Sequence, residues 1–163
     1  MEAARPPLPE ELERVAELHR LAVDTARPER GGAVFAARET GGEPLIEWLQ
    51  ARLADGGLWA GTVADAIVGY AVAASEVLRD GSRLGRLEAI FVEQEARGVG
   101  VGAALMDEVL RWADDQACDG IDAWALPGDR HTKNFFEGTG FSARLLVMHH
   151  RMKPITSSED VDQ

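Results

Sequence analysis

The sequence predicts a single mixed α/β (α+β) domain, in which helices flank a largely antiparallel sheet that contains one βαβ crossover. Its 163 residues suffice for one hydrophobic core and leave no room for a second domain. Hydrophobic residues make up 45% and charged residues 28% of the chain, as in folded globular proteins. Segments of helical and strand periodicity follow one another without an internal repeat. We expect the domain to cover residues 1–155 and the polar tail, residues 156–163, to be disordered.

Two helices are predicted in the first third of the chain. Residues 9–23 place apolar side chains mostly three or four positions apart, which is the pattern of one helix face. Residues 44–53 repeat the pattern between Pro44, a favourable helix start, and the pair Gly56-Gly57. The intervening residues 33–38 fit either a strand or part of a loop.

The middle of the chain has the pattern of an antiparallel meander. Apolar runs at residues 58–63 and 67–72 are joined by Ala64-Asp65-Ala66, which predicts a hairpin. A turn signal at residues 80–82 precedes a third strand at residues 86–92.

The last part of the chain predicts a βαβ crossover. A helical pattern at residues 105–113 is followed by a strand at residues 121–126, so the strands on either side of this helix would run parallel. A short helix through Phe135-Phe136 is then expected to stop at Gly140. We interpret the apolar run at residues 145–148 as a final strand.

The charge balance and the cysteine content limit the partners. The 28 acidic and 17 basic residues give a formal net charge of −11, which repels nucleic acid and attracts cationic amines, although acidic surfaces commonly serve solubility alone. Cys118 has no partner for an internal disulfide, and His149 and His150 would lie on opposite faces of a strand, so we expect no metal site. Residues 1–12 lack the apolar core of a secretory signal, and no apolar window is long enough to span a membrane. We expect a cytoplasmic protein without a membrane partner.

A glycine-rich loop joins the strand at residues 86–92 to the long helix. The first turn of a helix leaves backbone N–H groups unpaired and carries partial positive charge, so glycines there let a diphosphate reach those donors. The residues predicted to bind it are Arg97, Gly98, Val99, Gly100, Val101, Gly102 and Ala103. A glycine turn without a ligand is the simpler alternative.

An NAD-type site is a second alternative, because residues 98–103 also fit the dinucleotide pattern with alanine in the third place. Two observations oppose an NAD-linked oxidoreductase. Residues 93–97 separate the loop from its strand, whereas a dinucleotide turn follows its strand directly, and only one βαβ unit is visible.

Two motifs give the chain a resemblance to the GNAT superfamily of acyl-CoA-dependent N-acyltransferases. The family's pyrophosphate loop reads Gln/Arg-x-x-Gly-x-Gly/Ala, which Arg97, Gly100 and Gly102 match. The family's downstream motif, Asn-x-x-Ala-x-x-Phe/Leu-Tyr-x-x-x-Gly-Phe, corresponds to residues 129–141, with matches that include Phe135. The element order agrees over most of the chain, but the family's usual first strand is not evident.

The resemblance implies that acetyl-CoA is the co-substrate. Its pantetheine arm would lie where two central parallel strands, residues 88–92 and 121–126, splay apart, and would pair with the backbone like an added strand. Beyond the loop, the resemblance assigns cofactor contacts to Ile90, Phe91, Val92, Asp129, Asn134, Phe135 and Phe136.

The implied reaction is transfer of the acetyl group to a primary amine by direct attack in a ternary complex. The backbone N–H of Val92 would polarise the thioester carbonyl. Glu88, nine residues before Arg97, is the candidate base, with an ion pair to Arg86 or Arg83 as its alternative role. Phe136 replaces the tyrosine thought to protonate the CoA thiolate in many relatives.

Other functions and partners stay open. Because a phenyl ring donates no proton, Phe136 also fits a non-catalytic acetyl-CoA-binding module. The acceptor is either a small-molecule amine or a protein amine, and a homodimer is possible. His131 is expected at the surface, with a role as substitute acid as its alternative, while Trp48 and Trp59 fit the core better than an acceptor pocket.

Overall fold

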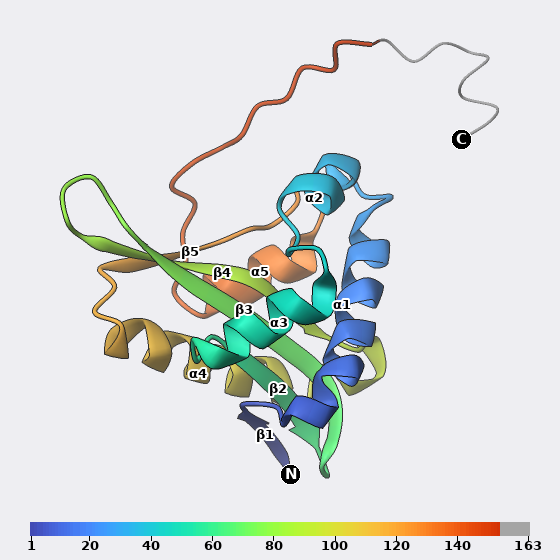
Figure 1. Cartoon of the computed structure of the whole chain (residues 1–163). Coiled ribbons are helices and arrows are strands. Elements are labelled where there is room, and N and C mark those ends of the chain that lie inside the picture. Colours follow the sequence, from blue (N-terminus) through green and yellow to red (C-terminus); the bar gives the residue numbers. More distant parts are fainter. Residues whose placement is uncertain (154–163) are drawn as a thin grey trace.

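A five-stranded sheet whose strands lie side by side in chain order organises the protein (Figure 1). The computed structural model describes residues 1–153, so the predicted tail, residues 156–163, lies outside the described residues. The strands are β1 (Glu2–Arg5), β2 (Leu58–Val63), β3 (Ala66–Val77), β4 (Arg83–Val92) and β5 (Gly120–Ala123). β1 to β4 pair antiparallel and β4 pairs parallel with β5, which confirms the predicted mixed, mostly antiparallel sheet with one crossover.

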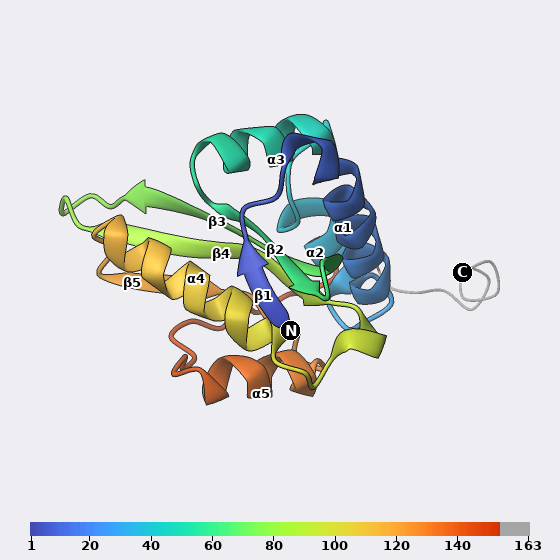
Figure 2. The same ribbon diagram turned by 90° about the horizontal axis from the view of Figure 1, so that it is seen from below.

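Helices cover both faces of this sheet. They are α1 (Leu12–Ala26), α2 (Gly32–Arg38), α3 (Leu45–Ala54), α4 (Val101–Asp115) and α5 (Arg130–Gly138), with short 3-10 turns at Pro9–Glu11 and Gln94–Ala96. Figure 2 shows α1 and α3 on one side of the sheet and α4 and α5 on the other. The domain is therefore a three-layer arrangement with one core on each side of the sheet.

The alternation of side chains along β3 separates these two cores. Tyr70 and Val72 point toward α1 and α3, whereas Ala71 and Ala73 point toward α4. Small residues bring α4 close to the sheet: a Cβ added at Gly61 would lie 2.5 Å from Val101.

Besides shifts in the ends of several elements, the structure differs from the sequence prediction at four places. β1, which the sequence did not reveal, pairs with β2 from Glu2 opposite Val63 to Arg5 opposite Ala60. Residues 33–38, predicted as a strand or loop, belong to helix α2, which follows Gly31 in a left-handed conformation. β5 ends at Ala123, three residues before the predicted end. Residues 145–148 form no strand and are exposed.

A β-bulge marks the point where β4 and β5 separate. Val72 pairs with Ala89 and Ala73 pairs with Leu87, so Glu88 is the extra residue in β4. The pairing of β4 with β5 ends at Leu87 opposite Ala123, while β4 continues to Val92. The predicted splaying of these parallel strands is thus present, and within residues 1–153 no strand pairs with the second half of β4 on its β5 side.

Leu105 on α4 is fully buried in the core on that face, so Leu105→Ala should lower the free energy of unfolding by about 2 to 5 kcal/mol through lost burial and a cavity. Leu110→Ala on the same helix is the matched control, because Leu110 is 37% exposed and should change the same quantity by less than about 1 kcal/mol. Urea unfolding at equilibrium measures both. Equal losses in the two variants would contradict this assignment of the core.

Candidate active site

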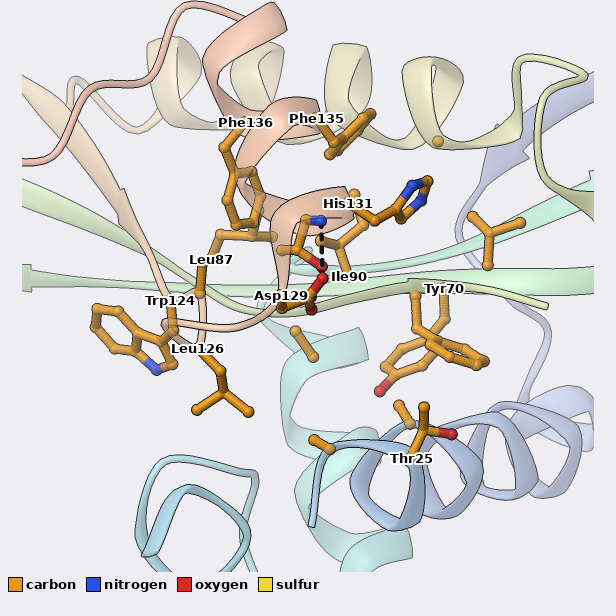
Figure 3. Close-up of a pocket in the computed structure, with 18 of the residues that line it drawn as sticks. Thr25, Tyr70, Leu87, Ile90, Trp124, Leu126, Asp129, His131, Phe135 and Phe136 are labelled. Carbon is orange, nitrogen blue, oxygen red and sulfur yellow. Dashed lines mark hydrogen bonds between the residues drawn. The ribbon is translucent and has the colours of Figure 1, made fainter. Parts of the chain in front are cut away.

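A cavity of about 530 Å³ opens where β4 extends beyond β5. The parts of the chain that line it are α1 and α2, β3 and β4, the loop before α4 with the first turn of α4, the segment after β5, and α5 (Figure 3). The lining residues outside the predicted set include His19, Thr25, Glu29, Phe35, Thr40, Tyr70, Leu87, Trp124, Leu126 and Thr132.

The main chain of β4 presents hydrogen-bonding groups to this cavity. The N–H of Glu93 donates to the carbonyl of Val68 on β3, at 2.8 Å, which fixes the alternation along the antiparallel ladder. The direction of the backbone groups alternates from one paired residue to the next. Phe91 lies two residues before Glu93, so its N–H and C=O also point toward β3. Ile90 and Val92 direct theirs to the opposite side, which β5 no longer occupies. Both residues line the cavity.

The loop before α4 adds a second set of open amides. Gly98 and Gly100 have φ values of 83° and 98°, a left-handed conformation that glycine adopts without strain. The first helical hydrogen bond of α4 runs from the N–H of Ala104 to the carbonyl of Gly100, so the N–H groups of the three residues before Ala104 precede the ladder. This helix end faces the cavity through Gly100, Gly102 and Ala103.

Arg97 closes the loop onto the end of β4. Its Nε donates to the carbonyl of Val92 at 3.1 Å, and its guanidinium lies 5.9 Å from the centre of the Phe91 ring. The side chain is exposed and lines the same cavity as the first turn of α4.

α5 forms the opposite wall. Asp129 caps this helix: one carboxylate oxygen accepts from the N–H of Thr132 at 3.0 Å and the other from its hydroxyl at 2.6 Å (Figure 3). The ring of Phe135 packs on α4, where a Cβ added at Gly102 would lie 3.3 Å from it. Phe136 is buried against Phe141, with ring centres 5.3 Å apart, so an aromatic ring without a hydroxyl occupies this wall.

Glu88, the bulged residue of β4, reaches the cavity and has a partner that the sequence did not indicate. Its carboxylate accepts from Nε of Arg52 on α3 at 2.6 Å, and both side chains are largely buried. The proposed partners Arg86 and Arg83 contact Glu76 and Ser75 instead. An ion pair for Glu88 is therefore present, but with a different arginine.

His19 and Tyr70 form a buried polar pair at the cavity that the sequence prediction missed. His19 Nδ1 lies 2.8 Å from the Tyr70 hydroxyl, which Figure 3 shows pointing toward α1. Burial, with a smaller contribution from the charge of Arg20, lowers the pKa of His19 from 6.5 to about 4. Burial raises the pKa of Tyr70, so its hydroxyl keeps its proton. The only available signal was a histidine on the apolar face of the first helix.

Most of the predicted site residues line the cavity, and three do not. Val101 is buried in the core beside β2, Val99 is half exposed outside the cavity, and Asn134 is exposed on α5 away from it. Trp48 and Trp59 pack in the two cores, as the sequence favoured. His131 is exposed, as predicted, and also lines the cavity.

The fold is similar to those of solved acetyltransferase structures. AAC(6')-Iy, an aminoglycoside N-acetyltransferase solved with CoA, is 18% identical with a TM-score of 0.70, over 94% of this chain and 96% of that chain. A predicted acetyltransferase of Clostridium acetobutylicum, solved with acetyl-CoA, is 15% identical with a TM-score of 0.68, over 93% and 97%. The ribosomal-protein-alanine N-acetyltransferase of Brucella melitensis biovar Abortus 2308 is 15% identical with a TM-score of 0.64, over 94% and 100%. At these identities the similarity establishes the fold. A search of curated proteins found no match.

The sequence model of the acetyltransferase (GNAT) family matches residues 16–141, most of the chain. The chain therefore belongs to the acetyltransferase (GNAT) family, which confirms the predicted enzyme class. Within residues 1–153 the sheet has a single parallel pair of strands, which rules out the doubly wound fold of the NAD alternative. No helix within residues 1–153 combines the length and the apolar character needed to cross a membrane.

Because His19 is neutral when buried, acid should destabilise the protein through this residue. Its pKa is lower in the folded than in the unfolded chain, so the unfolded chain binds the extra proton as pH falls from about 6.5 to about 4. Wild type should lose up to about 3 kcal/mol of its free energy of unfolding through His19 between these two pH values, and His19→Gln should not show this loss. Urea unfolding at several pH values measures it, and parallel curves for the two proteins would contradict the assignment.

Proposed function

We propose that this acetyltransferase moves the acetyl group of acetyl-CoA to a primary amine by direct attack in a ternary complex. The observation that carries the proposal is the pair of outward main-chain positions, Ile90 and Val92, beside the open N-terminus of α4. Together they offer sites for the amides of a pantetheine arm and for a diphosphate. The relatives solved with CoA and acetyl-CoA support the choice of co-substrate.

The loop fits the diphosphate in both shape and charge. A Cβ added at Gly98 would meet no atom within 4 Å, so the space beside its backbone is open. The amides of Gly102 and Ala103 would donate to the phosphate oxygens, and Arg97 would add a charge-assisted contact. Both oxygens of the Asp129 carboxylate already accept hydrogen bonds in the cap of α5. We therefore assign the cofactor contact at this position to backbone groups next to the side chain.

Bound acetyl-CoA supplies an acyl thioester. In the proposed reaction the ammonium group of the acceptor first loses one proton. The free amine nitrogen then bonds to the carbonyl carbon, the carbon–sulfur bond breaks as CoA leaves as a thiolate, and the nitrogen releases its second proton to water. The N–H of Val92 would stabilise the carbonyl oxygen as its charge grows. Glu88 would attract the protonated amine and take its proton through water, with Arg52 holding the carboxylate in place.

The CoA thiolate can leave without an acid from the protein, so the reaction is compatible with Phe136, whose ring donates no proton. A thiol has an ordinary pKa of about 8.5, so its thiolate is a competent leaving group near neutral pH. We assign no proton transfer to Phe136 and give it a packing role against the cofactor.

We place the acceptor at the other end of the cavity, between α1, α2 and the segment after β5. Glu29 supplies negative charge, Glu88 adds a carboxylate that is paired with Arg52, and Phe35 and Trp124 supply apolar surface. This combination suits a cationic amine. Both the aminoglycoside and the protein amine named for the relatives belong to that class.

Ala103→Glu tests the diphosphate site without removing a structural contact. A carboxylate in the first turn favours the helix but repels a diphosphate, so the dissociation constant for CoA should rise at least about tenfold. Ala103→Gln, of nearly the same size but uncharged, is the matched control and should bind more tightly than Ala103→Glu. Isothermal titration calorimetry measures both. If wild type itself gives no heat with CoA or acetyl-CoA, the proposed function is wrong.

Glu88→Gln tests the acceptor chemistry. We expect kcat/KM for an amine substrate to fall by about 10- to 100-fold near neutral pH and to recover partly at high pH, where the amine is unprotonated. The pH profile of CoA release measures this, and an unchanged dissociation constant for CoA shows that the cavity is intact. The same rate as wild type at every pH would remove Glu88 from the mechanism.

A non-catalytic acetyl-CoA-binding module is the second candidate, favoured by the phenyl ring of Phe136. The same experiments separate the two. Tight binding of acetyl-CoA with no CoA release above background, across a broad panel of amines, would favour the binding module.

A further inference from the structure

A buried imidazole on α1 forms part of the cavity wall at the end where we place the acceptor. His19 is 6% exposed, and its ring centre lies 5.2 Å from that of Trp48 and 5.8 Å from that of Tyr70. Its Nδ1 lies 2.8 Å from the Tyr70 hydroxyl, which points toward α1 in Figure 3. The acetyl transfer described above uses neither of these two polar side chains.

The Tyr70 hydroxyl determines which nitrogen of His19 carries the proton. Tyr70 is fully buried, and burial raises the pKa of its hydroxyl, so the hydroxyl hydrogen stays in place. Within residues 1–153, His19 Nδ1 is the only hydrogen-bond partner of this hydroxyl. If Nδ1 carried a proton, the hydroxyl hydrogen would be buried without an acceptor, which is costly. The imidazole, which burial keeps neutral, therefore accepts at Nδ1 and carries its proton on Nε2.

The Nε2 atom of His19 has access to the cavity. The ring makes its hydrogen bond through Nδ1 alone. Yet Nε2 is not a buried atom without a partner, because Trp112 Nε1 is the only such side-chain nitrogen or oxygen among the described residues. Nε2 therefore reaches open space, and the space that this ring lines is the cavity. The imidazole thus presents one N–H donor to the cavity and no acceptor.

This donor stands apart from the other polar side chains on the same wall. The hydroxyls of Thr25 and Thr40 already donate to main-chain carbonyls four residues earlier in the chain. The carboxylate of Glu29 can only accept hydrogen bonds. Among the cavity-lining side chains of residues 12–40, the Nε2–H of His19 is therefore the donor that is left for a ligand.

The donor lies near the strand that would hold the thioester. Tyr70 pairs with Phe91 across the ladder of β3 and β4, and both side chains belong to the core on the α1 side. Phe91 stands between Ile90 and Val92, whose main-chain groups we assign to the bound acetyl-CoA. A ligand atom that accepts from Nε2–H would therefore lie close to the reacting amine.

The charge of the cavity determines what kind of atom suits this donor. An N–H group binds an oxygen acceptor, whereas an ammonium group has no acceptor to offer it. A carboxylate on the ligand would be repelled by Glu29, by Glu88 and by the net charge of −11. A neutral oxygen, either a carbonyl or a hydroxyl, avoids both problems.

We propose that His19 determines acceptor specificity, by donating its Nε2–H to a neutral carbonyl or hydroxyl oxygen next to the reacting amine. The acceptor class is then an amine with such an oxygen close by, as in a peptide N-terminus or an amino alcohol. Tyr70 is a positioning residue, because it holds the imidazole in the donor tautomer. This inference rests on the proposed function, since it assigns a role within the acceptor end of the same cavity.

The first test needs no substrate. In protein with isotope-labelled histidine, NMR spectra near neutral pH should show His19 as a neutral ring with its proton on Nε2. The signals are assigned by their loss in His19→Gln. Tyr70→Phe removes the hydroxyl that selects the tautomer, so a mixture of the two neutral tautomers is expected in that variant. A proton on Nδ1 in wild type, or a charged ring, would overturn the proposal.

The second test measures selectivity with three amines that share a benzyl group. Phenethylamine carries no oxygen, phenylalaninamide carries a carbonyl and phenylalaninol a hydroxyl. Because these amines differ in basicity, each is compared between wild type and variant. His19→Leu should lower kcat/KM at least about tenfold for the two oxygen-bearing amines, and less than about twofold for phenethylamine. His19→Gln, which keeps an N–H donor, should recover part of the loss.

Two controls keep the outcome decisive. An unchanged dissociation constant for CoA shows that the cavity of a variant is intact. If His19→Leu does not fold because the Tyr70 hydroxyl has lost its partner, the double change His19→Leu with Tyr70→Phe removes that hydroxyl as well. Equal losses for all three amines, or no loss for any, would overturn the role of His19.

Failure of the proposed function gives a different result. In that case no amine is acetylated, and the Nε2–H signal of wild type still decides the inference. This signal should shift when phenylalaninamide is added in the presence of CoA, and should not shift with phenethylamine. The same response to both amines, or no response to either, would overturn the inference.

Discussion

The separation of β4 from β5 is the constraint on which the rest of the site depends. Ladder pairing between these parallel strands stops at Leu87 and Ala123, next to the bulge at Glu88. Past that point β4 keeps its antiparallel neighbour, while no strand of the described chain pairs with its other side and only the carbonyl of Val92 has a side-chain donor, Arg97. A sheet normally satisfies such groups with another strand. Here they face a cavity, and the first turn of α4 opens onto the same space.

Local patterns in the sequence were enough to predict most of the fold. The order of the elements was predicted correctly from the helical periodicity of α1, α3 and α4 and from the apolar runs of β2 to β4. Each of these patterns marks side chains on a buried face. β1 carries no such pattern: Glu2 to Arg5 owes its strand conformation to pairing with β2, which is a tertiary effect. Residues 145–148 show the reverse case, since an apolar run predicts a strand only when a neighbour is present to pair with it.

The site divides in the same way between local and distant determinants. The glycine loop and β4 are adjacent in the chain, so the sequence revealed their position at the start of a helix. The pairs Arg52 with Glu88 and His19 with Tyr70 join residues 36 and 51 positions apart, and no spacing rule connects them. They became visible only when the packing of α1 and α3 against the sheet was known.

The outward main-chain groups of β4 have a consequence for how freely this sequence can diverge. Their direction is set by the ladder with β3 and by strand length, so replacing Ile90 or Val92 with another strand-forming side chain leaves the same donors and acceptors in place. The walls contributed by α1, α2 and the segment after β5 have no such protection, because there each side chain is itself the contact surface. One end of the cavity is thus robust to mutational drift, and the other is free to be remodelled for a new compound without disturbing it.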